Sequence, residues 1–380
     1  MIFRFSATLE TPVAISKQRA TGNSLETLNF IPGTVLRGAM AEAYLRKGRP
    51  DDAAFATLFL EDNVRFGNLR LGGYPRWPLS ARWCKQSEDH PQFDLLCLYA
   101  ARELSTFDVD AKKLFECTEC GSKIAHPGDG YRVPSEKDQL YKDLKPKVRR
   151  QAHVEIDPEF QRSRNGRLYS ANVMTREQTF EGRIWASEKA APALKTLAGR
   201  DLTLWLGRGR SRGQGRVTAR LEDETPASPA KMRQHIEALN QKATDLFPMF
   251  GDRVLFSCTM QSPAILLDQW LLSKGQLAAA DIDASLNEYK LLACFTRPAD
   301  IAGWNAAPRA QLPKAEVRAI AAGSCFLFAK LHTGEKKAEY ARLAEALARA
   351  EDERLGERRE EGFGEAAFCE RFHYEGAIGP

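Results

Sequence analysis

The sequence has no long apolar run and no export signal. None of its hydrophobic stretches approaches the ~20 residues that span a bilayer. The N-terminus, "MIFRFSATLE", contains neither the apolar core nor the cleavage site of a secretory signal. Eight cysteines are scattered over 380 residues, and without such a signal they are expected to be thiols or metal ligands rather than disulfides. The sequence therefore predicts a cytoplasmic protein without a membrane partner.

Common catalytic motifs are also missing. There is no G-x-S-x-G nucleophile elbow. No glutamate stands beside a candidate zinc ligand in an H-x-E or H-E-x-x-H arrangement. His235, His332 and His373 lie in ordinary helix or strand contexts. We therefore predict that the chain is not an enzyme.

Charge is present but unevenly distributed. The net charge is +5, and counting Lys and Arg against Asp and Glu gives +7 for residues 1–225 and −2 for residues 226–380. The positive charge is densest in two tracts, residues 142–176 and 197–220. A local basic excess of this kind favours a surface that binds a polyanion, and a solvated basic face is the alternative.

Periodicity indicates an α+β fold repeated in two halves. Apolar residues alternate at the N-terminus, as in a half-buried strand, and "IPGTVLRGAMAEAYLRK" carries a helical apolar stripe. The second half repeats this order with a strand "DRVLFSCTM", a helix "EKKAEYARLAEALARAEDERL" and a closing strand "FCERFHY". We predict two tandem ferredoxin-like (RRM-like) domains, residues 1–225 and 233–380, separated by the linker "LEDETPASPAKM". The first would contain a loop-rich insertion at about 61–141, a β-hairpin arm at about 145–175 and a loop at 207–215.

That loop, "GRGRSRGQGRV", is the most unusual stretch of the chain. Its glycines permit a backbone with positive φ that approaches a ligand closely, and its arginines could bind phosphate in bidentate fashion. It lacks the Gly-Lys-Ser/Thr of a nucleotide P-loop, and it follows a late strand rather than the first strand of a dinucleotide fold. A loop that tracks a nucleic-acid backbone remains, with a solvated turn as the alternative. The candidate contacts are Gly207, Arg208, Gly209, Arg210, Ser211, Arg212, Gly213 and Gly215.

A pair of cysteines in "CTEC" has the spacing of two ligands in a tetrahedral zinc site. Two further ligands are needed, and Cys84 and His90 lie upstream in a polar, loop-like context. We predict a structural zinc held by Cys84, His90, Cys117 and Cys120, because the insertion has little core of its own. Cys97 and His126 are the alternatives to His90 as the fourth ligand.

The first of the two basic tracts, residues 142–176, predicts an extended hairpin whose tip is "SRNGR". His153, Arg162, Arg164 and Arg167 on this arm could lie along a nucleic-acid strand. An alternative is a metal-independent ribonuclease in which His153 acts with nearby lysines or Tyr169, although the sequence shows no evident acid–base partner for it. A zinc-stapled DNA-binding or scaffold protein is a second alternative.

These elements, in this order, resemble a known family. "IPGTVLRGAM", "HVEIDPEF" with "GRLYSANVM", "GRGRSRGQGRV", "PKAEVRAIAAGSCF" and "GERREEGFGEA" are similar to segments of the RAMP superfamily of CRISPR-associated proteins. The chain looks most like the subunit of type III effector complexes, particularly type III-D, that caps the five-prime end of the guide RNA. The resemblance covers nearly the whole chain.

The resemblance implies a non-catalytic subunit that binds the five-prime handle of the CRISPR guide RNA. It would contact the large Palm-domain subunit and the backbone RAMP subunits, and target RNA only indirectly. Arg37 and its helix start, the hairpin near 153–167 and the loop 207–215 would line the RNA path. Related backbone subunits that cut target RNA carry an aspartate in the loop after the first strand, whereas residues 17–33 contain only Glu26 as an acidic residue. Target cleavage by this chain is therefore not expected.

Overall fold

The computed structural model describes the chain in ten stretches, and it forms a mixed α+β fold within them. The stretches are residues 1–17, 24–46, 53–104, 115–136, 141–156, 159, 163–304, 313–332, 334–375 and 377–378. The chain divides into two compact units. Unit 1 comprises Met1–Tyr74, Leu144–Thr225 and Glu360–Gly362, and unit 2 comprises Pro75–Asp143, Pro226–Arg359 and Phe363–Pro380.

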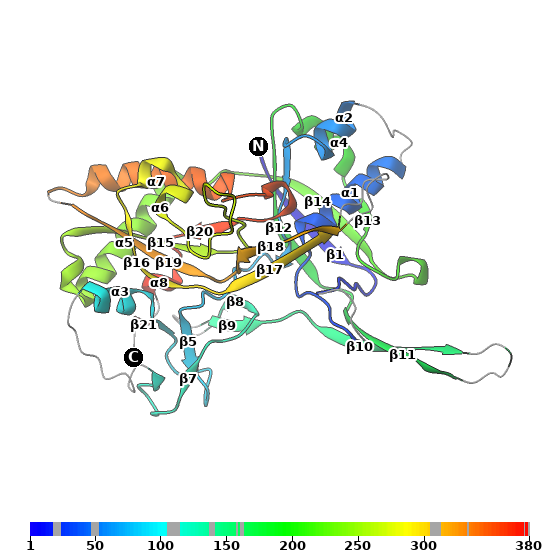
Figure 1. Ribbon diagram of the computed structural model, residues 1–380, viewed down its shortest axis with the longest axis horizontal. Coiled ribbons are helices and arrows are strands. Elements are labelled where there is room, and N and C mark those ends of the chain that lie inside the picture. The colour runs from blue at the N-terminus through cyan, green and yellow to red at the C-terminus, as the bar shows by residue number, and fades with distance from the viewer. Residues whose placement is uncertain are drawn as a thin grey trace. The chain divides into compact units, whose positions relative to one another are not determined.

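Unit 1 is built on one antiparallel sheet with helices packed on it (Figure 1). The strands of unit 1 are β1 (Ile2–Leu9), β2 (Ser24–Leu25), β3 (Val64–Phe66), β4 (Arg70–Leu71), β10 (Val148–Ile156), β11 (Ser163–Met174), β12 (Thr179–Ala186), β13 (Leu202–Trp205) and β14 (Arg216–Glu224). Of these, β2, β10 and β11 form a separate sheet. The helices of unit 1 are α1 (Gly33–Arg46), α2 (Ala53–Phe59) and α4 (Ala191–Ala198). The sheet has the order β13-β14-β1-β12-β3, and β4 also pairs with β12.

The apolar pattern at the N-terminus explains the central strand of this sheet. Phe3, Phe5, Ala7 and Leu9 are almost completely buried, and the residues between them are exposed or half-buried, as the alternation predicts. Helix α1 begins directly after Pro32 and buries Leu36, Ala39 and Met40 in the same core. Because Pro lacks an N–H and has a fixed φ, it is well suited to the start of a helix.

Strands β10 and β11 form a long antiparallel hairpin (Figure 1). Pairing runs from Val148 opposite Met174 to Ile156 opposite Ser163, and β2 joins β11 in parallel. The hairpin agrees with the sequence, but its predicted tip does not. The segment "SRNGR" occupies the first five residues of β11 instead.

The described residues of unit 2 form four sheets. Its strands are β5 (Ala81–Cys84), β6 (Phe93–Asp94), β7 (Ile124–Ala125), β8 (Tyr131–Pro134), β9 (Tyr141–Leu144), β15 (Arg253–Met260), β16 (Lys290–Phe295), β17 (Pro298–Trp304), β18 (Pro313–Ile320), β19 (Cys325–Leu331), β20 (Ala366–Phe368) and β21 (Ala377–Ile378). Its helices are α3 (Leu96–Leu104), α5 (Pro229–Leu246), α6 (Ala279–Ile282), α7 (Lys337–Glu353) and α8 (Phe372–Glu375). The largest sheets are β16-β19-β15-β20 and β21-β6-β5-β7, and β17-β18 and β8-β9 form two-stranded sheets.

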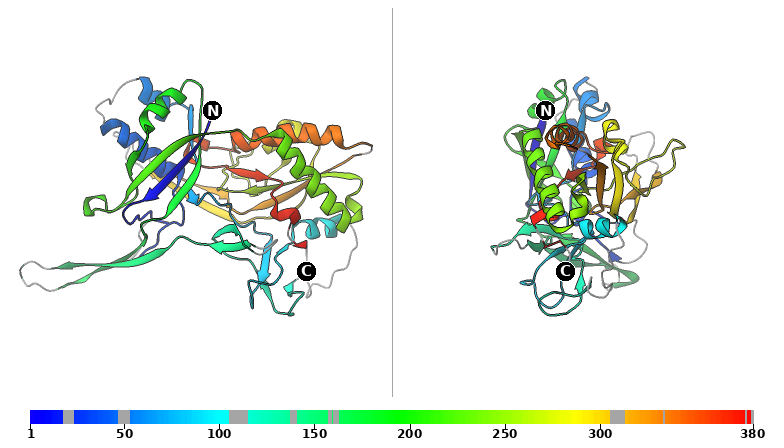
Figure 2. Two further views of the ribbon diagram at one scale, coloured as in Figure 1. Left: turned by 180° about the vertical axis from the view of Figure 1, so that it is seen from behind. Right: turned by 90° about the vertical axis from the view of Figure 1, so that its left-hand side faces the viewer.

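Helices α5 and α7 pack against each other and against the sheet of β15, β16, β19 and β20 (Figure 2). The predicted amphipathic helix is α7, and it buries Leu343 and Leu347 completely. The predicted strand "DRVLFSCTM" is β15. Nearly every residue of β15 is buried, on both faces of the sheet, because helices cover one face and α3 and neighbouring segments lie against the rest of this core.

Most of the predicted insertion at about 61–141 belongs to unit 2, whereas the sequence analysis placed it in the first domain. Residues Pro75–Asp143 group with the C-terminal half of the chain, not with residues 1–74. The reason is that α3 contributes its apolar face, including Leu96, Ala100 and Ala101, to the hydrophobic core of unit 2. The first part of the predicted insertion, β3 and β4, belongs to the sheet of unit 1.

Two further boundaries differ from the sequence predictions. The predicted closing strand ends early, because β20 stops at Phe368, Cys369 adopts a positive φ of 47°, and α8 begins at Phe372. The predicted linker is also shorter than expected. Strand β14 continues to Glu224, and α5 begins at Pro229 with Ser228 as its N-cap, which accepts a hydrogen bond from the Lys231 N–H.

Two buried polar networks lie in unit 2. His373 is fully buried; its Nδ1 lies 2.7 Å from Asp94 Oδ2 and its Nε2 lies 2.8 Å from Thr259 Oγ1. Glu339 accepts hydrogen bonds from the Tyr289 hydroxyl at 2.8 Å and from Arg342 Nη2 at 2.7 Å. Burial alone would raise the pKa of the Glu339 carboxyl, but these donors outweigh burial and lower the pKa to about 2.

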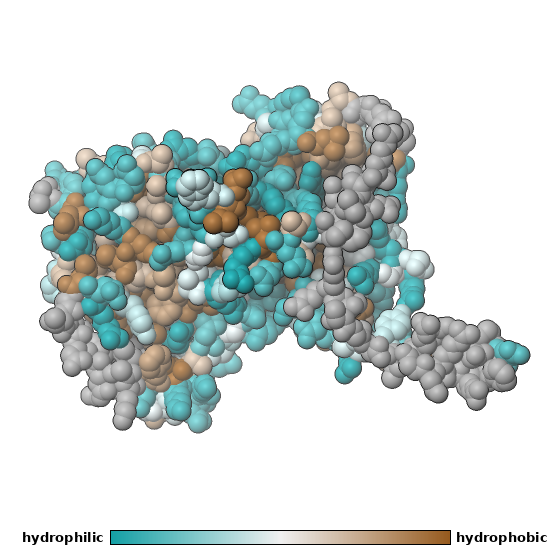
Figure 3. Space-filling view, in the orientation of Figure 1, coloured by the Kyte–Doolittle hydropathy of each residue, from teal (hydrophilic) through white to brown (hydrophobic). Residues whose placement is uncertain are grey.

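The face seen in Figure 3 is largely hydrophilic, with hydrophobic residues gathered in smaller areas. Among the described residues, no helix is long and apolar enough to cross a membrane.

Candidate nucleic-acid interface

The Gly/Arg loop connects β13 to β14, and its glycines hold backbone conformations that other residues rarely adopt. Gly207, Gly209, Gly213 and Gly215 have φ values of 71°, 75°, 76° and 90°. A Cβ atom on Gly207 would clash with the Ala14 carbonyl, and one on Gly215 would clash with the Leu206 carbonyl. The prediction that these glycines adopt positive φ is therefore confirmed. The close approaches seen here are to carbonyls of the chain itself, and close approach to a ligand stays a prediction.

The loop is fastened to the segment that follows β1. The Arg208 N–H donates to the Ala14 carbonyl at 2.9 Å, and the Gly215 N–H donates to the Pro12 carbonyl at 2.9 Å. Arg210–Arg212 form a single 3₁₀ turn at its tip. Within the described residues, the N–H groups of Gly209, Arg210 and Ser211 donate no hydrogen bond.

The four arginines of the loop differ in their partners. Arg210 forms an ion pair with Glu42, and Arg216 forms one with Glu10. Arg212 donates to the hydroxyl of Tyr169. The Arg208 side chain is exposed and has no ion-pair partner within the described part of the chain. The sequence predicted phosphate contacts from all four arginines. Among the described residues, Arg208 and Arg212 have no acidic partner, whereas Arg210 and Arg216 are neutralised by glutamates.

The base of the hairpin lies beside this loop. His153 and Tyr169 face each other across β10 and β11, and their rings stack with centroids 4.9 Å apart and an interplanar angle of 19°. Gln214 Nε2 donates to Gln151 Oε1 at 2.7 Å. Together with the Arg212–Tyr169 bond, this contact joins the loop to the hairpin.

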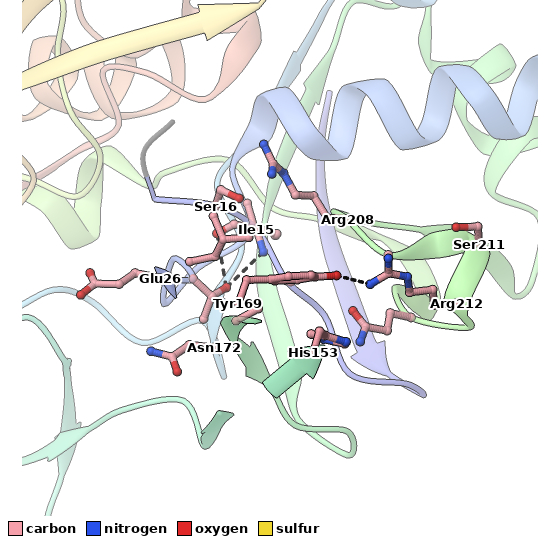
Figure 4. Close-up of a pocket in the computed structure, with 15 residues that line it drawn as sticks. Ile15, Ser16, Glu26, His153, Tyr169, Asn172, Arg208, Ser211 and Arg212 are labelled. Atoms are coloured by element: carbon pink, nitrogen blue, oxygen red, sulfur yellow. Dashed lines mark hydrogen bonds between the residues drawn. The ribbon is translucent and has the colours of Figure 1, made fainter. Parts of the chain in front are cut away.

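A pocket of about 310 Å³ lies within unit 1 (Figure 4). It is enclosed by the Gly/Arg loop, the β10–β11 hairpin and the segments that follow β1. Its walls combine apolar and polar groups. They comprise Ala14, Ile15, Ser16, Leu25, Glu26, Thr27, His153, Tyr169, Ala171, Asn172, Arg208, Gly209, Ser211, Arg212 and Gln214. In Figure 4 the Tyr169 ring lies between His153 on one side and Arg208 on the other.

The other predicted RNA contacts have different positions. Arg37 lies outside the pocket lining; it donates to the Phe59 carbonyl at 2.6 Å and lies 3.6 Å from Glu361. Arg162 lies outside the described residues. Arg164 and Arg167 lie in β11, for which only the backbone is described at these positions.

Sequence reasoning did not assign most of the pocket lining. Ser16, Thr27, Asn172 and Gln214 were not expected, because no local pattern marks them. Tyr169 was considered only for a ribonuclease. The two-residue period of β11 places Tyr169 and Ala171 on one face, and this is the signal that could have identified both.

A second cluster, in unit 2, brings together the four predicted metal ligands. One ligand atom from each of Cys84, His90, Cys117 and Cys120 lies within 4.8 Å of all the others. Cys84 Sγ is 3.6 Å from Cys120 Sγ, and Cys117 Sγ is 3.5 Å from His90 Nδ1. The cluster could hold a metal ion, and three sulfurs with one imidazole nitrogen suit zinc.

The alternative ligands are engaged elsewhere. Cys97 is fully buried in α3, where burial raises the pKa of its thiol. His126 Nε2 lies 3.2 Å from the Pro78 carbonyl oxygen, and His126 Nδ1 accepts from the Gly128 N–H at 3.1 Å. Neither belongs to the cluster.

Hydrogen bonding favours thiolates at two positions of the cluster. The hydroxyl and N–H of Ser122 lower the pKa of Cys120 to about 6. Burial tends to raise the pKa of Cys84, but the N–H groups of Gln86 and Ser87 outweigh it and lower the pKa. Since metals bind the thiolate, these shifts favour metal binding.

Comparison with known families identifies the chain. The sequence profile of the RAMP superfamily matches residues 6–218, more than half of the chain. The chain belongs to the RAMP superfamily. The profile described as CRISPR-associated protein (Cas_Cmr3) matches residues 132–370 of this RAMP protein. The resemblance indicated by the sequence motifs is thus confirmed for a CRISPR-associated RAMP protein.

No curated protein sequence matches this RAMP protein significantly. Similar solved structures include a chain of a Type III-B Cmr-beta complex bound to cognate target RNA and AMPPnP, with 12% identity, a TM-score of 0.44, and coverage of 85% of this chain and 86% of that one. A crystal structure of Pyrococcus furiosus Cmr4 (Cas7) has 12% identity and a TM-score of 0.27, and covers 59% of this chain and 100% of that one. At such TM-scores, neither similarity supports a conclusion about partners or activity.

Proposed function

We propose that this RAMP protein is a non-catalytic subunit of a type III, III-D-like, CRISPR effector complex that binds the five-prime handle of the guide RNA. The observation that carries the proposal is the pocket of unit 1. There, the exposed Arg208 and the Tyr169-bonded Arg212 lie beside a His–Tyr ring stack. Both rings are half-buried and line the pocket. Cations beside an aromatic surface in such a pocket suit a single-stranded nucleic acid: the cations bind its phosphates, and the aromatic rings bind its bases.

RNA is preferred over DNA because of the sequence resemblance to the guide-capping subunit. The pocket alone supports binding of a single-stranded polyanion. A filter-binding assay with the guide RNA of the same CRISPR locus tests the proposal. We expect salt-dependent binding that a DNA of the same sequence matches poorly. Equal affinity for the DNA would contradict specific recognition of RNA. If the protein bound neither nucleic acid, the proposed function would be wrong.

A non-catalytic role is supported by the surroundings of His153. Its ring stacks on Tyr169, and no hydrogen bond from it to another described residue is found. General acid–base cleavage of RNA requires a second group within hydrogen-bonding reach. The ribonuclease remains the second candidate, because the pocket does bring His153 and Tyr169 together. Specific, EDTA-resistant cleavage of a repeat-containing transcript that is lost in His153→Ala would establish it instead.

We further propose the large Palm-domain subunit and the backbone RAMP subunits as partners, with target RNA contacted indirectly. Membership of the RAMP superfamily supports a role within a multi-subunit ribonucleoprotein. Co-expression with the large subunit and the first backbone subunit of the same locus should give one complex in size-exclusion chromatography. Separate elution of the three proteins with guide RNA present would contradict this proposal.

The proposed domain architecture is two ferredoxin-like domains, one in each unit. The order β14-β1-β12-β3 in unit 1 and the order β16-β19-β15-β20 in unit 2 support it. In each unit, a helix precedes the strand that comes last in the sequence among these four, α4 before β14 and α7 before β20. This arrangement agrees with the β-α-β-β-α-β plan of the ferredoxin-like fold.

The proposed cofactor is one structural zinc at Cys84, His90, Cys117 and Cys120. The three sulfurs and one imidazole nitrogen already lie within 4.8 Å of one another. A bound ion would cross-link the end of β5, which holds Cys84, to the turn that carries Cys117 and Cys120. Elemental analysis should find close to one zinc per chain. The double variant Cys117→Ser, Cys120→Ser should lose the zinc, whereas Cys294→Ser, outside the cluster, should retain it. Full zinc content in the double variant would exclude these ligands.

A further inference from the structure

We propose that the pocket of unit 1 holds one unpaired nucleobase, stacked on the face of Tyr169 that His153 leaves open. This inference rests on the proposed RNA-binding function and specifies what enters the site. The ligand is a single nucleotide within a longer strand. Its base occupies the pocket, and its phosphate lies at the Gly/Arg loop.

The stacking surface is already fixed in orientation. His153 covers one face of the Tyr169 ring at a centroid distance of 4.9 Å, and Arg212 binds the phenolic oxygen at the ring edge. Both contacts restrict rotation of the Tyr169 side chain, so little conformational entropy is lost when a base stacks on it. The other side of the ring faces the pocket, towards Arg208 (Figure 4).

The size of the pocket suits one base rather than a duplex. Its volume of about 310 Å³ lies at the lower end of the range for small-molecule sites. Ile15 and Ala171 give it apolar walls that match the faces and edges of an aromatic ligand. Proteins commonly read single-stranded RNA by placing splayed-out bases on aromatic side chains and Arg planes, because unstacked bases are accessible only outside a duplex.

The loop supplies a place for the phosphate at the same pocket. Arg208 has no acidic partner among the described residues, and the N–H groups of Gly209, Arg210 and Ser211 are without acceptors there. Gly209, Ser211 and Arg208 all line the pocket. A phosphate next to the stacked base would therefore meet a guanidinium and several free N–H groups.

The experiment couples one protein residue to one RNA position. Wild type and Tyr169→Ala are titrated with the guide RNA and with a series in which each nucleotide in turn is made abasic. We expect Tyr169→Ala to bind the intact RNA roughly 5- to 150-fold more weakly, the effect of losing about 1–3 kcal/mol of base stacking. One abasic position should weaken wild type by a similar factor and leave Tyr169→Ala unaffected.

Tyr169→Phe is the matched control, since it keeps the stacking surface and loses only the bond to Arg212. It should retain the dependence on that one position. When wild-type protein binds RNA that carries 2-aminopurine at that position, stacking on Tyr169 should quench the 2-aminopurine fluorescence. This measurement uses only the wild-type protein, so it does not depend on whether a variant folds. If wild type binds RNA but no abasic position couples to Tyr169, the base site is wrong and the RNA-binding function stands. If wild type does not bind guide RNA, both fail.

Discussion

The ion-pair partners of the loop arginines predict which of these arginines contact RNA phosphates and which only add positive charge to the protein. Arg208 is exposed and has no acidic partner in the part of the chain that the structure describes, and Arg212 binds Tyr169. Arg210 and Arg216 are neutralised by glutamates. Two double variants, Arg208→Ala with Arg212→Ala and Arg210→Ala with Arg216→Ala, therefore remove the same formal charge. Only the first pair should remove phosphate contacts.

The magnitude follows from counterion release. Each phosphate contact on a single strand contributes about 0.7 to the slope of log affinity against log salt. Loss of two contacts should lower the slope by about 1.4. Over the change from about 50 to 200 mM salt, the loss of affinity would then be roughly sevenfold smaller than for wild type. The second double variant should keep a slope close to that of wild type.

Fluorescence anisotropy with labelled guide RNA at several salt concentrations measures these slopes. Thermal unfolding of each variant checks that the fold is kept. Equal slope changes in the two double variants would show that the ion pairs do not decide which arginines meet RNA. Unchanged slopes in both would show that the loop is a solvated turn.

Three further predictions concern stability. Gly207→Ala should lower the melting temperature more than Gly213→Ala, since both have positive φ but only the Gly207 Cβ meets a backbone carbonyl. Glu339→Gln should lower the free energy of unfolding by about 1–2 kcal/mol at neutral pH, because the folded-state pKa of the Glu339 carboxyl, about 2, lies below its usual 4.5. Solvent around the ion-paired Arg342 keeps the effect this small. This stabilisation is present above pH 4.5 and lost as pH falls towards 2, so urea melts of variant and wild type should converge there, and a pH-independent difference would contradict it. His373→Ala should cost about 3–5 kcal/mol in urea melts, since it leaves Asp94 buried without its partner. A loss below about 1 kcal/mol would show that this pair contributes little.

Local patterns predicted the elements that depend on one segment alone. The alternation of Phe3, Phe5 and Ala7 predicts β1, because burial on one face of a strand repeats every second residue. The spacing of four residues between Leu343 and Leu347, as on one face of an amphipathic helix, predicts α7. The sequence "CTEC" and the upstream Cys84 and His90 predicted the cluster correctly. The two cysteines have the spacing of two ligands of a tetrahedral site, and the upstream pair lies in a polar, loop-like context.

Ends of elements were less predictable, because several conformations compete there. The segment "FCERFHY" alternates like a strand, yet a positive φ at Cys369 redirects the chain into α8, where Phe372 and His373 are buried. The "SRNGR" segment has turn composition, but it forms the first five residues of β11, where Ser163 pairs with Ile156 and the register shifts before Leu168 pairs with Val154. Composition alone did not distinguish a turn from an irregular strand end in that case.

By itself, the sequence determined the α+β character, the need for glycine at positive φ in the loop and the candidate ligand pair Cys117 and Cys120, since each follows from residues near one another or from residue type. The tertiary structure decided among His90, Cys97 and His126 as the fourth member of the cluster. Only the tertiary structure decided which arginines remain available and to which core the insertion belongs. Arg210 meets Glu42 across 168 residues, and His373 meets Asp94 across 279. Such pairs neutralise or bury charges through long-range packing, and no local periodicity encodes which distant carboxylate a given cation will reach.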